Sequence, residues 1–257
     1  FGESRHLLAF RASLHEHSSA MQTTILLLLA AVLLVGALGW LLHWLLIRTE
    51  GVFLGRRVVV WLYDLAAPRY DAIKQYDPDT ESAFVAWPLS RRLKGRPAPA
   101  VLDVATGTGR LPFFLLAEPI FNGRVVGLDA SVGMLAQAWA KLAAYDDRAA
   151  LVRGSAVDLP FADNAFAAVT CLEALEFLPD DAAALREMAR VLEPGGVLLT
   201  TRRQGAEAGY FLGRARGREE LEALLADLGL VDVRSQPWQV EYELVWAAKG
   251  PARVSQI

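Results

Sequence analysis

Cysteine and histidine are scarce in this chain. Cys171 is the only cysteine among 257 residues, which excludes an intrachain disulfide and a metal cluster built on cysteines. The 4 histidines all lie at or before His43, so any chemistry in the rest of the chain must proceed without imidazole. A strong charge of one sign is also lacking, because the net charge is -3 and there is no long basic run. We therefore expect neither a metal ion nor a nucleic acid as a partner.

A long apolar run is what the N-terminal part does contain. Thr24 to Ile47 has no charged residue, and at about 1.5 Å per residue it can cross a hydrocarbon core of roughly 30 Å. Trp40 and Trp44 lie near one end, where indole rings favour the membrane interface, and Arg48 closes the run. A cleaved signal peptide would have a shorter apolar part, and a buried core helix would show a polar face. The run predicts a single transmembrane helix over 23–48.

The charges beside this run predict its orientation. Arginines follow it at positions 48, 56, 57 and 69, whereas Arg5 and Arg11 precede it. An excess of positive charge after the span places the large C-terminal part in the cytoplasm. Residues 1–22 are expected to be a tail, as a fragment or an upstream extension, because Met21 directly precedes the apolar run.

Beyond residue 98, strand-like and helix-like segments alternate. Strands are predicted at 101–104, 124–128, 151–153, 165–172, 197–201, 231–233 and 242–247, and helices at 111–117, 133–144, 182–192 and 218–228. This alternation predicts an α/β fold with a doubly wound, mostly parallel sheet over 98–250. The last two strands are joined by a link around Pro237 that is too short for a helical crossover, so they should pair antiparallel.

The segment 49–97 connects the span to this domain. Tyr-Asp pairs recur in it, at Tyr63, Tyr70 and Tyr76. One interpretation is a pair of amphipathic helices that pack on the core or lie on the bilayer surface. The other is a helical lid over a substrate pocket, with Tyr63 and Tyr70 facing the pocket. The sequence leaves both open.

A glycine turn follows the first strand of the domain. The run Val101-Leu-Asp-Val-Ala-Thr-Gly-Thr-Gly109 reads as a buried strand, a tight turn and the start of a helix, where backbone N–H groups can face a ligand. Asp129 comes about twenty residues later, at the end of the second strand, where a carboxylate can accept both hydroxyls of a ribose. A helix N-cap is the other interpretation of Asp129. A dinucleotide fingerprint would have a third glycine where this chain has Pro112, which weakens a nicotinamide site.

Four motifs in order resemble one enzyme family. They are the glycine turn above, Gly127-Leu-Asp-Ala-Ser-Val-Gly-Met-Leu, Asp158-Leu-Pro-Phe-Ala-Asp-Asn-Ala-Phe, and Arg190-Val-Leu-Glu-Pro-Gly-Gly. Together they resemble the class I S-adenosylmethionine-dependent methyltransferases, and more loosely their ubiquinone/menaquinone biosynthesis branch. The resemblance implies a Rossmann-like seven-stranded sheet with an antiparallel final hairpin, and S-adenosylmethionine as the cofactor.

The resemblance also assigns cofactor-binding residues. The motif around the methionine part of the cofactor corresponds to Asp103, Ala105, Gly107 and Gly109, the ribose ligand to Asp129, and the residues beside the adenine to Ala130, Met134, Ser155 and Ala156. Ser155 stands where the family often has an aspartate, and its hydroxyl can still accept a hydrogen bond from the adenine amino group. Cys171 should lie beside the transferred methyl, as a small buried side chain.

Candidate catalytic residues come from the end of the fourth strand and from the lid. Glu173 and Glu176 are the available carboxylates, and Glu176 stands where many relatives carry histidine. Either can serve as a general base or lie solvated on a loop. Tyr70 is the candidate from the lid.

These features predict a membrane-anchored methyltransferase that acts on a small or lipid-like acceptor. Two alternatives remain from the sequence: a nicotinamide-dependent oxidoreductase, and a non-catalytic, membrane-tethered binding protein on the same fold.

Overall fold

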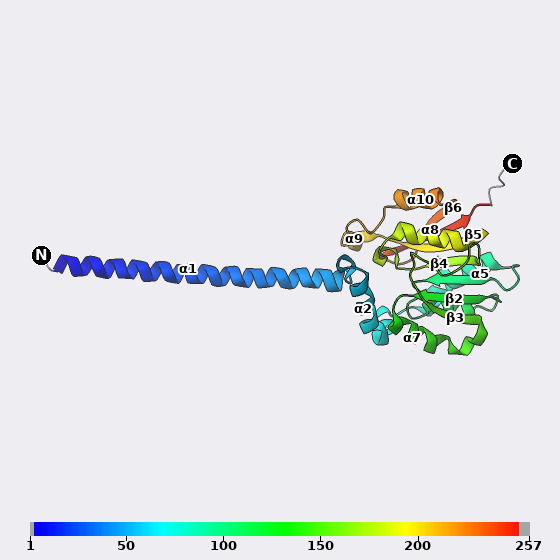
Figure 1. Cartoon of the computed structure of the whole chain (residues 1–257), viewed down its shortest axis with the longest axis horizontal. Coiled ribbons are helices and arrows are strands. Elements are labelled where there is room, and N and C mark those ends of the chain that lie inside the picture. Colours follow the sequence, from blue (N-terminus) through cyan, green and yellow to red (C-terminus); the bar gives the residue numbers. More distant parts are fainter. Residues whose placement is uncertain (1–2, 252–257) are drawn as a thin grey trace. The chain divides into compact units, whose positions relative to one another are not determined.

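The computed structural model describes residues 3–251, apart from the side chains of residues 3–9 and 11–20. The chain divides into two compact units, one that ends at Thr49 and one that begins at Glu50 (Figure 1).

The first unit is a long helix. Helix α1 (Glu3–His43) continues into a π-helical turn, η1 (Trp44–Arg48). Its part Met21–Arg48 is 28 residues long with a mean hydropathy of 2.8, and 0% of its most apolar window is buried. A core helix would be mostly buried, so this alternative does not fit, whereas a membrane anchor and a signal sequence both do. The helix begins at Glu3 and not at residue 23, because no proline or glycine interrupts 3–22.

The second unit is built on a seven-stranded sheet in the order β3-β2-β1-β4-β5-β7-β6. The strands are β1 (Ala100–Val104), β2 (Arg124–Asp129), β3 (Ala149–Arg153), β4 (Phe166–Cys171), β5 (Leu192–Arg203), β6 (Leu230–Pro237) and β7 (Tyr242–Lys249). The pairs from β3 to β5 are parallel, and β7 is antiparallel to both β5 and β6. The predicted seven-stranded sheet with an antiparallel final hairpin is therefore confirmed.

Helices cover both faces of this sheet. They are α6 (Arg110–Ala117), α7 (Val132–Leu142), η5 (Ala143–Arg148), η6 (Leu175–Phe177), α8 (Asp181–Val191), α9 (Gly205–Ala208) and α10 (Arg218–Asp227). Alternate residues of a strand point to opposite faces, so Leu102 packs in a cluster with Leu185 of α8 and Leu221 of α10, while Val101 packs with Leu115 of α6. Figure 1 shows α8 and α10 on the same side of the sheet.

The segment between the span and the sheet is helical throughout most of its length. Its elements are η2 (Val52–Leu54), α2 (Arg56–Ala66), η3 (Ala67–Arg69), α3 (Tyr70–Lys74), α4 (Pro78–Glu81), η4 (Ser82–Ala86) and α5 (Trp87–Leu93). Val85, Leu89 and Leu93 recur at helical spacing and join the core cluster that contains Val101. The last part of the predicted linker is thus a core helix pair that covers the sheet.

One predicted turn lies inside a strand. Residues 193–196 were expected to connect a helix to the fifth strand, but β5 already begins at Leu192. The pairing of β4 with β5 shifts register between Phe166 and Ala168, and Gly195 has φ 72°. The glycines therefore form a bulge, which lets the ladder continue past them.

Candidate active site

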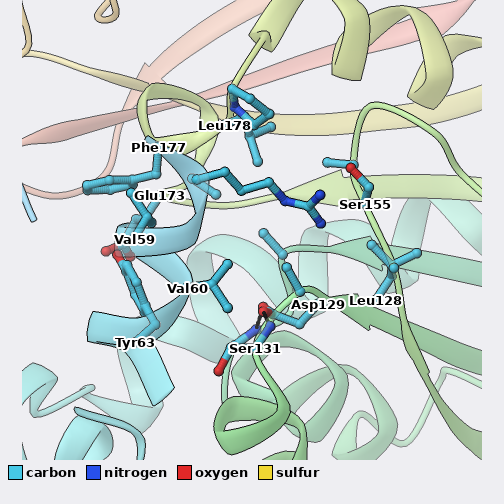
Figure 2. A pocket seen from close by; sticks show the side chains of 18 of the residues that line it. Val59, Val60, Tyr63, Leu128, Asp129, Ser131, Ser155, Glu173, Phe177 and Leu178 are labelled. Carbon is cyan, nitrogen blue, oxygen red and sulfur yellow. Dashed lines mark hydrogen bonds between the residues drawn. The ribbon is translucent and has the colours of Figure 1, made fainter. Parts of the chain in front are cut away.

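A cavity of the second unit, referred to below as the main cavity, lies where β1, β2 and β4 end. Strand β1 pairs with β2 on one side and with β4 on the other, so the chain crosses over in opposite directions at this point, where open α/β sheets bind their ligands. The cavity encloses about 790 Å³ of space, including its open mouth. Figure 2 shows its wall, which is formed by Arg56, Val59, Val60, Tyr63, Tyr70, Ala105, Gly107, Leu128, Asp129, Ala130, Ser131, Gly154, Ser155, Ala156, Leu172, Glu173, Ala174, Phe177, Leu178 and Pro179.

The glycine turn supplies one side of this cavity. Ala105 and Gly107 both have φ 56°, a left-handed conformation that glycine adopts without strain. A Cβ added at Gly107 would meet nothing within 4 Å, so the backbone there is open to a ligand. Gly109 has φ 76°, and a Cβ there would lie 3.1 Å from that of Ala138, so this glycine instead allows α7 to approach.

Asp129 holds the turn and faces the cavity. Its Oδ2 accepts a hydrogen bond from the N–H of Gly107 at 2.8 Å, and its Oδ1 accepts one from the N–H of Ser131 at 2.8 Å. Burial raises the pKa of Asp129, while these backbone donors lower it. The N-cap of α7 is Ser131, whose Oγ accepts from the N–H of Met134 at 3.0 Å. The capping role is thus filled by Ser131, and Asp129 remains available to a ligand.

Asp103 supports the turn from the end of β1. Its Oδ2 accepts from Thr106 Oγ1 at 2.7 Å and its Oδ1 from Thr170 Oγ1 at 2.6 Å. Burial raises the pKa of Asp103 to about 6, although both threonine hydroxyls act in the opposite direction.

Of the predicted cofactor-binding residues, those absent from the cavity wall are Asp103, Gly109, Met134 and Cys171. Burial raises the pKa of the Cys171 thiol well above its usual value, as expected of a small buried side chain.

The other predicted cofactor-binding residues lie together. Ala130, Ser155 and Ala156 line the cavity beside Leu128 and Gly154, as the ends of β2 and β3 meet there. In Figure 2, Ser155 and Leu128 lie on the same side of the cavity.

Helix α2 and Tyr70 form the opposite wall. The Tyr63 hydroxyl donates to Glu50 Oε2 at 2.7 Å, and the Tyr63 ring lies 5.9 Å from that of Tyr70 and 6.0 Å from that of Phe177. Burial raises the pKa of Tyr70, so its phenol is neutral and cannot serve as a base near pH 7. The last helices of this segment pack on the core, and Tyr63 and Tyr70 line the cavity.

The aspartates of the Tyr-Asp pairs attach this wall to the rest of the unit. Asp64 Oδ1 accepts from Ser131 Oγ at 2.5 Å and from the N–H of Gly133 at 2.8 Å. Asp71 accepts from Thr108 Oγ1 at 2.6 Å and pairs with Lys141 at 2.7 Å. The Tyr-Asp pairs were visible in the sequence as a repeat, but the sequence did not show that Asp64 and Asp71 bond this wall to the rest of the unit.

Glu173 lies in a cluster of charges at the end of β4. Its backbone has φ 51°, and its carboxylate pairs with Arg110 at 2.8 Å and with Lys74 at 3.2 Å. Burial by itself would raise the pKa of Glu173, but the charges of Arg110 and Lys74 outweigh burial and lower it. Glu173 is therefore an ionised, oriented carboxylate and not a solvated one. Arg110 also pairs with Glu81 at 3.5 Å and lies over the Tyr76 ring at 4.2 Å.

Glu176 lies elsewhere. Its Oε1 accepts from Arg203 Nε at 2.6 Å and from the Tyr242 hydroxyl at 2.5 Å, and only 2% of the residue is exposed. It does not line the main cavity. The structure thus brings Glu173 and Tyr70 together at the cavity wall and separates Glu176 from them, in a buried ion pair and not on a solvated loop.

Comparison with known proteins identifies the type of domain. Residues 101–196 match a family described as "Methyltransferase domain". The demethylmenaquinone methyltransferase of Symbiobacterium thermophilum is 37% identical over 139 residues, which cover 52% of this chain and 55% of that protein. The 2-phytyl-1,4-naphtoquinone methyltransferase of Synechococcus elongatus is 35% identical over 143 residues, covering 52% of this chain and 58% of the relative. This chain therefore matches little more than half the length of these relatives.

Solved structures share the fold. The [4+2]-cyclase SpnF has a TM-score of 0.63 at 19% identity and covers 77% of this chain and 97% of its own. A SAM-dependent methyltransferase from Aquifex aeolicus has a TM-score of 0.54 at 22% identity, covering 68% of this chain and 95% of its own. One of these neighbours is described as a cyclase, so the fold by itself does not determine the reaction. The family match at 101–196 favours methyl transfer over the nicotinamide alternative.

Proposed function

We propose that this chain, which carries a class I S-adenosylmethionine-dependent methyltransferase domain, methylates a quinone-type acceptor held in a membrane. The observation that carries the proposal is the open glycine turn pinned to Asp129 at the crossover of the sheet, within a matched methyltransferase domain. The acceptor class is inferred from the relatives named for demethylmenaquinone and 2-phytyl-1,4-naphtoquinone methylation.

The cavity fits S-adenosylmethionine. The Asp129 carboxylate lies on the cavity wall, and each oxygen has a second lone pair that can accept a ribose hydroxyl. Leu128 and Ala156 offer apolar surface to an adenine ring, and the Ser155 hydroxyl can accept from its amino group. The exposed backbone at Gly107 leaves space for the methionine part.

The chain's own residues have to orient the acceptor and exclude water. When bound, S-adenosylmethionine supplies a methyl group on a sulfonium sulfur, which keeps the bonding electron pair as the acceptor takes the methyl and loses a proton. Alignment and exclusion of water then account for most of the rate gain. Tyr63, Tyr70 and Phe177 form the aromatic part of the wall, which suits a flat ring.

We assign the polar contact with the acceptor to Glu173 and Tyr70. Glu173 is ionised and fixed by two cations, so it can accept a hydrogen bond from an acceptor hydroxyl and hold the ring in place. Its lowered pKa makes it a weak base, and orientation is the role it supports best. Tyr70, with its neutral phenol, can donate to an acceptor oxygen.

The anchor and its orientation are part of the proposal. Helix α1 is long and apolar enough over Met21–Arg48 to span a bilayer. Arg48, Arg56 and Arg57 follow the span closely, which supports a catalytic unit on the cytoplasmic side. Tethering raises the local concentration of the enzyme near a membrane-held acceptor.

Calorimetry on the full chain in nanodiscs tests the cofactor site. We expect S-adenosylmethionine to bind, and Asp129→Asn to weaken it roughly 10- to 100-fold, because a charged hydrogen bond contributes about 1.5–3 kcal/mol. Asp147→Asn, at an exposed position off the cavity, is the matched control and should bind normally. Absence of binding at millimolar cofactor would overturn the proposal.

A radiolabelled methyl group tests the acceptor class. We expect the label from S-adenosylmethionine to enter a quinol extract and not to enter protein.

A further inference from the structure

Helix α2 has two faces with different surroundings. Val59, Val60 and Tyr63 line the main cavity. Arg57, Trp61 and Leu65 recur at i, i+4 and i+8 on the other side and are exposed, Trp61 by 59% and Leu65 by 68%. We refer to Arg57, Trp61 and Leu65 as the α2 outer face. One helix therefore forms the wall of the cavity with one side and presents an apolar and basic surface with the other.

Neighbouring elements extend this surface. Leu54 of η2 precedes the helix and is 44% exposed, and Ile73 of α3 follows it and is 65% exposed. On α7, Gly133 packs against α2, since a Cβ there would lie 3.0 Å from the Asp64 carbonyl oxygen. Val132 beside it is 52% exposed. Exposed apolar side chains thus lie on and beside one helix. Scattered single ones are normal on a protein surface, but a group of them indicates an interaction site.

Arginines without an ion pair accompany this surface. Arg57 and Arg69 are exposed, and neither forms an ion pair within the described part of the chain, whereas the exposed carboxylate of Asp64 on the same helix is bonded to Ser131 and Gly133. An amphipathic helix with indole and leucine on its apolar side and arginines beside them is the pattern of helices that lie in a membrane interface. Each arginine near an anionic leaflet contributes about 1 kcal/mol of attraction.

The sequence limits how far this helix can be from a bilayer. Arg56 lies eight residues after Arg48, where the apolar span ends. Eight fully extended residues cover at most about 29 Å at about 3.6 Å each. With the span in a bilayer, α2 is therefore held within reach of the headgroup layer, which identifies a lipid surface as the occupant of the outer face.

We propose that the α2 outer face docks on an anionic bilayer surface, so that the wall of the cavity lies at headgroup level and a lipid-borne acceptor enters from the membrane. Docking rests on the geometry of α2 and on the membrane span that belongs to the proposed function. The entry of the acceptor rests in addition on the proposed function.

Site-directed labelling of the full chain tests the docking. Cys171 is 0% exposed, so a bimane label introduced at Leu65→Cys reacts there and leaves Cys171 unmodified. Ile120→Cys is the matched control, since Ile120 is 43% exposed and lies between α6 and the start of β2, whereas the cavity lies where β2 ends. In phosphatidylcholine–phosphatidylglycerol vesicles we expect doxyl lipids to quench the label at 65 about twofold or more, and the label at 120 hardly at all. Equal quenching at both positions, with equal access for iodide, would overturn the docking.

A double substitution tests the consequence for the acceptor. Trp61→Glu with Leu65→Glu should raise KM for a long-chain, membrane-held quinol about tenfold, and leave KM for a short-chain, water-soluble quinol and the cofactor Kd unchanged. An unchanged KM for both quinols would contradict entry from the membrane. Absence of methyl transfer to either quinol by the wild type would overturn the proposed function and leave the labelling result standing.

Discussion

Asp103 and Asp129 are both buried aspartates at strand ends, but their hydrogen-bond partners differ. Asp129 accepts from two backbone N–H groups and lies on the cavity wall, whereas Asp103 accepts from two threonine hydroxyls. Hydroxyls stabilise an ionised carboxylate less well than burial destabilises it, and the pKa of Asp103 is raised to about 6. Asp103 thus makes the stability of the turn depend on pH.

We predict that Asp103→Asn flattens this dependence. A folded pKa of about 6 against about 3.8 for the free group means that the folded state binds the proton more tightly. The stabilisation is fully present below pH 4 and is lost as pH rises through 6, about 3 kcal/mol in all. The difference in unfolding free energy between wild type and Asp103→Asn should therefore decrease by about 3 kcal/mol from pH 4 to pH 7. Chemical denaturation at each pH measures it, and a constant gap would contradict the raised pKa.

Glu173 and Glu176 form a matched pair for mutation. Both are buried and paired with an arginine, but only Glu173 lines the cavity. Glu173→Gln should lower kcat about 10- to 100-fold with little change in cofactor Kd, because the acceptor loses a charged partner. Glu176→Gln should cost about 1–3 kcal/mol of stability, because Arg203 loses its shortest ion pair but keeps Glu207 and Glu241 at 3.6 Å, and should leave kcat of the folded fraction nearly unchanged. Steady-state kinetics measure the effect on kcat, and thermal unfolding measures the effect on stability. Equal losses of kcat in the two variants would contradict the assignment of the acceptor contact to Glu173.

Residues near the glycine turn could be located from the sequence because they are set by local motifs. The turn and Asp129 lie about twenty residues apart in one strand–helix–strand unit. The partners of Glu173 could not be found in this way, since Lys74 is 99 residues away in sequence and Gln239 is 66. The partners of Glu176 could not be found for the same reason: Arg203 and Tyr242 come from β5 and β7, which pair only in the folded sheet.

At the scale of elements, one side chain of α2 forms two hydrogen bonds with the N-terminal end of α7. Asp64→Ala removes two hydrogen bonds, to Ser131 Oγ and to the Gly133 N–H. We expect a loss of about 1–2 kcal/mol of stability and faster amide exchange over 56–69. Hydrogen exchange read by mass spectrometry measures this. Asp227→Ala, at the exposed end of α10, is the control. Unchanged amide exchange over 56–69 in Asp64→Ala would show that the hydrogen bonds of Asp64 do not hold α2 in place.

Regular elements were predictable where a period was clear. The buried strands β1, β2 and β4 and the helices α6 to α8 lie within a few residues of their expected bounds. The bulge at Gly195 could not be predicted, because two glycines in series usually indicate a turn. Only the pairing of β5 with β4 shows that the strand continues past them. Helix α5 fell within the segment 49–97 that was expected to connect the span to the domain, and only the folded structure shows Leu89 and Leu93 in the core.

At the scale of the whole molecule, the apolar helix Met21–Arg48 is the candidate membrane span. We predict that the full chain stays in the membrane pellet after alkaline washing. Leu33→Arg with Val35→Arg should move it to the soluble fraction, because each arginine at the centre of a span costs about 2.5–3.5 kcal/mol on insertion. Leu33→Ala with Val35→Ala is the control. A cleaved signal sequence would instead give a chain whose N-terminus, read by mass spectrometry, lies beyond the span.

The position of β7 between β5 and β6 affects how the chain is made. This strand, the last in the described sequence, pairs over Tyr242–Lys249 with both neighbours. Until it leaves the ribosome, the edge of β5 stays unpaired and the partner of Leu199 in the core, Trp246, is missing. The second unit can therefore complete its sheet only once β7 has left the ribosome, by a long-range pairing step that is slow and open to aggregation. Chaperone demand should then be concentrated in the time between release of β5 and insertion of β7.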